Sequence, residues 1–168
     1  MPETWQTFYL MVGSSSAGLI GLLFVVMTLT SEVEPSRAML GSRVYITPTV
    51  YHFAVLVLIG AVAVMPDVPA QIMAAVIVVP AATGFVVALV SLTRMLRGLP
   101  RAADASDFFF YAILPAVAYL WLIGSAAALW SGVAFAAFAI AGGAVALLLV
   151  GIRDAWDLAT WLARHRQG

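Results

Sequence analysis

The sequence contains five apolar segments, each close to the length that a helix needs to cross a membrane. About 20 apolar residues span the ~30 Å hydrocarbon core of a bilayer. The expected spans cover residues 5–30, 45–65, 70–92, 107–130 and 132–152, and a polar tail follows at 153–168. Charged residues make up only 10% of the chain, against about 25% in soluble domains. We therefore predict an all-α integral membrane protein, a five-transmembrane-helix bundle that forms one membrane domain over residues 1–168.

The arginines predict the orientation of this bundle. The chain has eight basic residues, all of them arginines, at positions Arg37, Arg43, Arg94, Arg97, Arg101, Arg153, Arg164 and Arg166. With five spans they all fall on one side of the membrane, whereas four or six spans would divide them between the two sides. Because basic loops stay in the cytoplasm, we predict that the N-terminus lies outside and the C-terminus lies in the cytoplasm.

Several chemistries are excluded by residue types that the sequence lacks. It contains no cysteine and no lysine, and its only histidines are His52 and His165. Thiolate catalysis, zinc-thiolate sites, Schiff-base chemistry and a phosphate-loop lysine are therefore ruled out. We expect no metal site, no cofactor and no nucleic-acid partner. The opening "MPETWQ" has no basic region, so we also expect no cleaved signal peptide.

The first span contains a patch of small residues, "GSSSAGLIGLLF", at positions 13–24. On a helical wheel, Gly13, Ala17 and Gly21 form a small-xxx-small ladder, and Ser14 and Gly18 form a second row beside it. Such faces let helix backbones approach closely inside a membrane. We predict that these five residues pack helices together.

Two further serines of the patch, Ser15 and Ser16, point away from this ladder. Their hydroxyls can bond to backbone carbonyls of their own helix or line a polar path. On the second span Tyr45, Thr49 and His52 share one face. At 1.5 Å per residue, His52 lies roughly 11 Å and Ser15 roughly 15 Å from the ends of their spans, close to the midplane. We predict that these five residues are candidates for lining a pathway.

His52 leaves three interpretations open. A neutral imidazole, hydrogen-bonded to a hydroxyl or a carbonyl, would lock two helices together. An ionisable residue within a membrane also indicates a functional site, here a solvated pathway or a proton relay. Contact with a quinone, a lipid or a cofactor is the third interpretation.

Charged residues gather where the fifth span meets the tail. Arg153, Asp154 and Asp157 surround Trp156 at this cytoplasmic rim. Asp157 can reach Arg153 one turn back, and Asp154 can pair with arginines of the loops, which predicts an interfacial belt of ion pairs. The alternative is an inner vestibule whose acidic mouth favours cations. The arginine-rich side should also attract anionic lipids.

Two stretches carry a resemblance to other proteins. "WQTFYLMVGSSSAGLIGLLFVVMTL" and "YITPTVYHF" are similar to the first two spans of a group of short, uncharacterised bacterial polytopic inner-membrane proteins. The resemblance implies a bacterial inner-membrane location and no activity.

These observations favour a homo-oligomeric membrane protein that forms an ion or small-solute pathway. Five spans without an inverted repeat are few for alternating access within one protomer, so we expect self-association. A non-catalytic accessory or assembly subunit of a larger complex is the alternative. An intramembrane serine hydrolase is more remote, because Gly-x-Ser-Gly is missing and no third orienting group accompanies Ser15 and His52. We expect no enzymatic activity.

Overall fold

The computed structural model describes residues 5–30, 47–98 and 109–165, and within these ranges every regular element is a helix. In chain order the elements are α1 (Gln6–Thr30), α3 (Thr47–Val64), α4 (Ala70–Gly98), the π-helix η3 (Phe109–Ile113), α6 (Leu114–Trp130) and α7 (Ala136–His165). The prediction of an all-helical protein is confirmed. Four helices are long and apolar enough to cross a membrane, and α3 is a shorter apolar helix.

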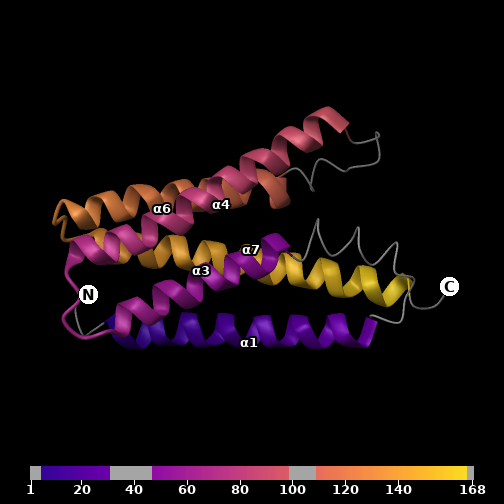
Figure 1. Cartoon of the computed structure of the whole chain (residues 1–168), viewed down its shortest axis with the longest axis horizontal. Helices are drawn as coiled ribbons and strands as arrows, with labels where there is room; N and C mark the ends of the chain where they lie inside the picture. The colour runs from indigo at the N-terminus through magenta and orange to yellow at the C-terminus, as the bar shows by residue number, and fades with distance from the viewer. Residues whose placement is uncertain (1–4, 31–46, 99–108, 166–168) are drawn as a thin grey trace.

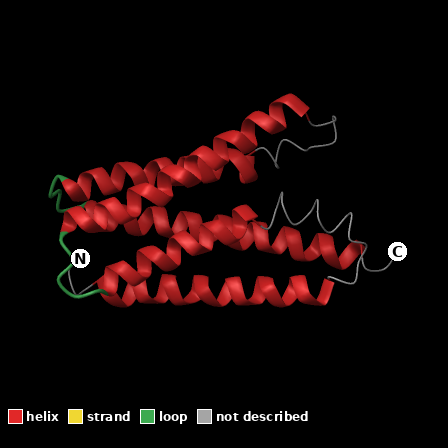
Figure 2. Ribbon diagram, in the orientation of Figure 1, coloured by secondary structure: helices red, strands yellow, loops and turns green. Residues whose placement is uncertain are grey.

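The helices lie side by side in one elongated bundle (Figures 1 and 2). Helix α1 packs along α3, helix α4 packs along α6, and α7 contacts both α6 and the α1–α3 pair. Consecutive helices run in opposite directions, so the start of α1 and the end of α7 lie at opposite ends of the bundle (Figure 1). Helix α3 also contacts α4, so α3 and α7 both join the two helix pairs.

Prolines mark the places where the helical backbone is irregular. Pro48 lies in the first turn of α3, where its missing N–H removes no intrahelical bond. Pro115 lies at the start of α6, directly after the π-helical turn η3. Pro80 lies inside α4, and its carbonyl accepts a hydrogen bond of 2.8 Å from the Tyr51 hydroxyl. This hydrogen bond joins α3 to α4 at the proline.

Helices α1 and α3 touch through their backbones. A Cβ added to Gly60 would lie 2.7 Å from the carbonyl oxygen of Tyr9 and 2.9 Å from the Cα of Gly13. Gly13 is therefore buried against α3, whereas Ser14, Ala17, Gly18 and Gly21 are exposed. Of the small residues expected to pack helices, only Gly13 meets another described helix of the same chain, and the others face outward.

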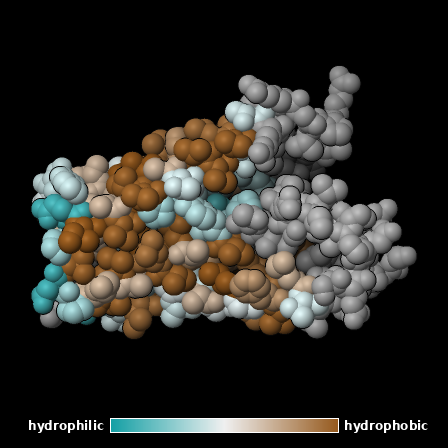
Figure 3. Space-filling view, in the orientation of Figure 1, coloured by the Kyte–Doolittle hydropathy of each residue, from teal (hydrophilic) through white to brown (hydrophobic). Residues whose placement is uncertain are grey.

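The interior of the bundle is filled by large apolar side chains. The fully buried ones include Phe53, Leu56, Ile59, Met73, Ile77, Leu122, Ile140 and Leu147. Many equally large apolar side chains are exposed, among them Leu22, Phe24, Val79, Trp121 and Leu149. Figure 3 shows this hydrophobic surface, broken along the middle of the bundle by paler, more hydrophilic residues. So large an apolar surface suits contact with lipid chains.

Tyr9 provides a test of how the ends of the bundle are held together. Its buried hydroxyl donates a hydrogen bond of 2.8 Å to the carbonyl oxygen of Ala137, which joins α1 to α7. Tyr9→Phe leaves that carbonyl without this donor and should lower the free energy of unfolding by about 1 kcal/mol. Reversible unfolding in mixed micelles measures the difference. A variant as stable as the wild type would show that the bond contributes nothing net.

Candidate functional site

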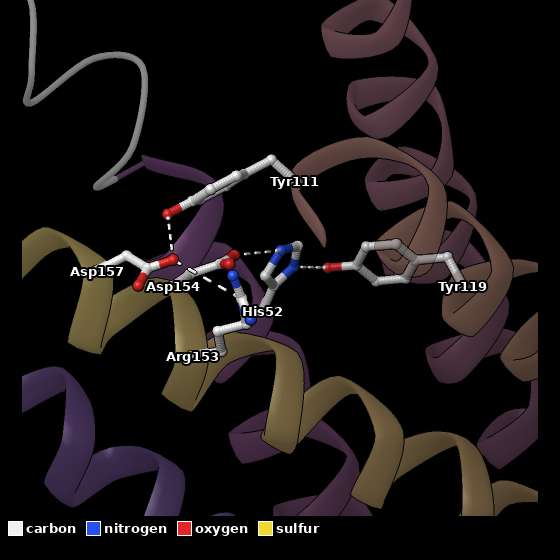
Figure 4. A network of polar contacts seen from close by, with 6 residues as sticks. All are labelled: His52, Tyr111, Tyr119, Arg153, Asp154 and Asp157. Carbon is white, nitrogen blue, oxygen red and sulfur yellow. Dashed lines mark hydrogen bonds and ion pairs between the residues drawn. The ribbon is translucent and has the colours of Figure 1, made fainter. Parts of the chain in front are cut away.

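One of the polar side chains in the interior is that of His52, which lies in the second turn of α3 and is 5% exposed. Its Nδ1 lies 2.7 Å from the hydroxyl of Tyr119 on α6. Its Nε2 lies 3.9 Å from the Oδ2 of Asp154 on α7. Figure 4 shows the imidazole between these two partners. Three helices therefore contribute to one buried group, which we call the His52 cluster: His52, Tyr119 and Asp154.

The local sequence explains why His52 points inward. Thr49, His52, Leu56 and Ile59 recur at intervals of three and four residues, so they share one face of α3, and all four are buried. Thr49, a predicted lining residue, is therefore an interior residue on the same face as His52. Tyr45, another predicted lining residue, lies outside the described residues.

Gly84 makes room for Tyr119 on the opposite side of the cluster. A Cβ at this position of α4 would collide with the Tyr119 ring. The ring therefore lies directly against the α4 backbone, and Tyr119 is fully buried. In this position its hydroxyl reaches the imidazole without any other side chain between them (Figure 4).

The two partners favour one tautomer of the neutral imidazole. A neutral ring has one N–H donor and one nitrogen that accepts. With the proton on Nε2, the ring directs its donor toward the Asp154 carboxylate. Nδ1 then accepts the hydrogen bond from the Tyr119 hydroxyl. Tyr119 thus holds the ring so that its proton faces Asp154.

Asp154 is the most deeply buried acidic side chain that the structure describes, at 2% exposed. Its Oδ1 is buried and has no hydrogen-bond partner among the described residues. The sequence placed this carboxylate at a cytoplasmic rim, paired with arginines of the loops. In the structure its Oδ2 faces His52, and Asp154 lies within an apolar stretch of α7 that continues to Thr160. The arginines of the first and third loops belong to segments whose side chains the structure does not describe.

The direct contacts of the neighbouring Arg153 are with residues other than this carboxylate. Its Nε lies 3.7 Å from the Oδ2 of Asp157, the pair expected from their spacing. Its guanidinium lies over the ring of Phe110, 3.5 Å from the centroid. Tyr111, on the π-helical turn, donates a hydrogen bond of 3.1 Å to the same Asp157 oxygen. These contacts form a half-exposed group beside the cluster, because the Arg153 and Asp157 side chains are 41% and 37% exposed.

The predicted serines lie apart from these contacts. The buried Ser16 hydroxyl donates a hydrogen bond of 2.8 Å to the carbonyl of Val12 in its own helix. Ser14 bonds to the carbonyl of Met11 in the same way, at 3.1 Å. Ser15 is exposed on the outer surface of α1. The ring nitrogens of His52 instead contact Tyr119 and Asp154.

Sequence reasoning missed Tyr119 as the hydroxyl partner of His52 and Asp154 as its acidic partner. Two signals were available. Tyr119 carries a hydroxyl in an otherwise apolar span, where a buried hydroxyl needs a partner. Asp154 and His52 both lie toward the arginine-rich ends of their helices. Because these ends are expected on the same side of the membrane, the two residues lie at similar depths.

The cluster joins a hydroxyl, an imidazole and a carboxylate, which are groups that exchange protons. Among the described residues no group of three or more metal-ligating side chains occurs. Comparisons of the chain with protein-family models, with curated proteins and with solved structures found no match. The function must therefore be argued from the site itself.

Proposed function

We propose that this protein is a homo-oligomeric permeation pathway for an ion or a small solute in the bacterial inner membrane. Four helices of membrane-spanning length and the shorter α3 support five crossings. The arginine distribution supports an N-terminus outside and a C-terminus in the cytoplasm. In this orientation the His52 cluster lies toward the cytoplasmic end of the bundle.

The observation that carries the proposal is the gathering of ionisable side chains from α3, α6 and α7 inside an apolar bundle. Burying an ionisable group in a membrane is costly, and such groups mark ion pathways and proton relays. A purely structural link between helices would be less costly if it used a neutral pair of hydroxyl and carbonyl groups. The buried Oδ1 of Asp154, which has no hydrogen-bond partner among the described residues, also supports the proposal. A polar group that serves only to hold helices together normally has its hydrogen-bonding capacity satisfied.

The lining of this pathway follows from burial. His52, Thr49 and Asp154 supply polar groups in the interior, and the half-exposed Arg153 and Asp157 form its cytoplasmic mouth. The basic side of the protein would also hold anionic lipids.

The exposed face of α1 supports self-association. Ser14, Ala17, Gly18 and Gly21 are exposed, and an added Cβ at either glycine meets no atom within 4 Å. A neighbouring subunit could approach this face closely. Ser15, beside it, would then line a path between subunits rather than within one.

Ion flux through purified protein in liposomes tests the proposal. Flux should depend on pH, because protonation changes the charge of the His52 cluster. His52→Ala should abolish that dependence. Thr83→Ala is the matched control, because Thr83 is exposed on α4 and its hydroxyl donates to the carbonyl of Val79 in its own helix. Folded, inserted protein that gives no flux above empty liposomes would overturn the pathway.

An accessory subunit is the second candidate, and the exposed small residues of α1 favour it equally well. An accessory subunit purified alone should be polydisperse, whereas a self-contained pathway should form one oligomer of defined size. Light scattering in detergent distinguishes these outcomes. We propose no serine hydrolase, because Ser15 is exposed on the outer surface of α1 and the ring nitrogens of His52 contact Tyr119 and Asp154.

A further inference from the structure

We propose that the ion carried is the proton, and that His52 and Asp154 together form its binding site. This inference rests on the proposed pathway and names its permeant species. Tyr119 is a positioning residue in this scheme, because it contacts the imidazole and not the carboxylate that receives the proton.

The first argument is the state of the Asp154 carboxylate. Its Oδ1 has no partner among the described residues, and its Oδ2 has only an imidazole nitrogen at 3.9 Å. That distance exceeds the ~2.7–3.2 Å of a hydrogen bond from nitrogen to oxygen. A buried charge with such incomplete compensation is unfavourable. Adding a proton to this pair relieves it, whereas a larger cation would need more oxygen ligands than the described residues supply.

The second argument is the position of the arginine. Arg153 immediately precedes Asp154, yet its guanidinium lies on Phe110 and its Nε faces Asp157. A guanidinium on Asp154 would hold the carboxylate permanently charged. With Arg153 directed elsewhere, no guanidinium whose position the structure describes holds the carboxylate in its charged form.

The binding step is simple to balance. A hydronium ion at the cytoplasmic mouth gives a proton to a carboxylate oxygen of Asp154: one O–H bond of the hydronium breaks, an O–H bond forms on Asp154, a water molecule is left, and the charge of the pair rises by one. Release breaks this bond and restores the carboxylate. The bound proton can reside on Asp154 beside a neutral ring, or as an imidazolium beside a carboxylate. The half-exposed Asp157, one turn beyond Asp154, provides the nearest acidic group at the mouth.

The other titratable groups around the pair are few. Among the residues of α3, η3, α6 and α7 whose side chains the structure describes, they are Tyr51, Tyr111, Tyr119, Arg153 and Asp157, and the Tyr51 hydroxyl donates to the Pro80 carbonyl. Helix α4 has no titratable residue from Ala70 to Thr93, and from Gln6 to Thr28 α1 has only Tyr9. Tyr9 is bonded to the Ala137 carbonyl. Within these parts of the chain, no lysine, further arginine or further acid competes for the proton.

Proton flux is the first measurement. The assay uses proteoliposomes that contain a pH-sensitive dye and carry a potassium diffusion potential. With wild-type protein the internal pH should change in the direction that the potential drives protons. Asp154→Asn should reduce the flux to the level of empty liposomes. Asp67→Asn is the matched control. Asp67 is exposed in the turn between α3 and α4 at a φ of 54°, a conformation that asparagine tolerates. It should retain wild-type flux.

Infrared spectroscopy is the second measurement, and it does not depend on transport. The wild type should show the C=O stretching band of a protonated carboxylic acid that appears and disappears with pH. This band should be absent in Asp154→Asn, while His52→Gln and Tyr119→Phe should change the pH at which it appears. Because the band is recorded on the wild type itself, a variant that fails to fold does not remove the test.

The outcomes separate the two proposals. Flux of other ions or solutes without proton flux, or a spectrum without a titrating Asp154 band, overturns the proton site and leaves the pathway standing. No flux of any ion from folded, inserted protein overturns the pathway and proton transport with it. Proton flux that is lost in Asp154→Asn, together with the titrating band, supports both.

Discussion

Gly60→Leu should separate α1 from α3 and destabilise the protein by about 3 kcal/mol, the upper part of the range for overpacking. The atoms that a Cβ would meet are the Tyr9 carbonyl oxygen and the Cα and nitrogen of Gly13. These are backbone atoms, so no rotation of a side chain can relieve the collision. The expected result is a lower midpoint of unfolding in mixed micelles, together with increased proteolysis of the detergent-solubilised protein.

The control for this experiment is Gly18→Leu. Gly18 lies on the same helix as Gly13, is exposed, and has no atom within 4 Å of an added Cβ. In a helix interior glycine is less favourable than alanine by about 0.8–1.0 kcal/mol, and leucine ranks next to alanine, so a monomer should be unchanged or slightly stabilised. Equal midpoints for Gly60→Leu and Gly18→Leu would contradict the close backbone contact.

Gly84→Leu should disturb the His52 cluster through the ring of Tyr119, which lies against Gly84. The new side chain would occupy the space of the Tyr119 ring, and the ring must move away from α4. The hydrogen bond between the Tyr119 hydroxyl and His52 Nδ1, 2.7 Å in the wild type, should then be lost. We expect a destabilisation of about 1–3 kcal/mol, together with the change in pH dependence that Tyr119→Phe produces.

Gly124→Leu on α6 is its counterpart, because an added Cβ there meets nothing within 4 Å. It should keep both the stability and the pH dependence of flux. If Gly84→Leu matched Gly124→Leu in both measurements, then Tyr119 would not be held against α4 as the structure shows.

The helices could be predicted from the sequence because their signal is local. An apolar run of membrane length predicts a helix wherever it occurs, and α1 begins within two residues of the expected position. The ends were less predictable. Helix α4 continues to Gly98, past the expected end at residue 92, because polar residues that leave an apolar span remain good helix formers.

The candidate site could be predicted only in part, because its contacts are not local. The periodicity of Thr49, His52 and Leu56 is enough to place these residues on one face. It does not reveal which helix that face meets, since every neighbouring span is apolar on most sides. Tyr119 and Asp154 became partners of His52 only through the packing of α6 and α7 against α3. The small-residue ladder on α1 illustrates the same difficulty, as only Gly13 faces α3.

The position of α7 at the junction of both helix pairs has a consequence for biogenesis. Translation delivers α1 and α3 first, and the glycine contact between them is available at once. Ribosomes add about 5–20 residues per second, so His52 enters the bilayer seconds before the Asp154 carboxylate leaves the ribosome. A nascent chain that stops before α7 would hold an imidazole in lipid without its acidic partner. The pairing of His52 with Asp154 therefore forms only once α7 has packed against α3.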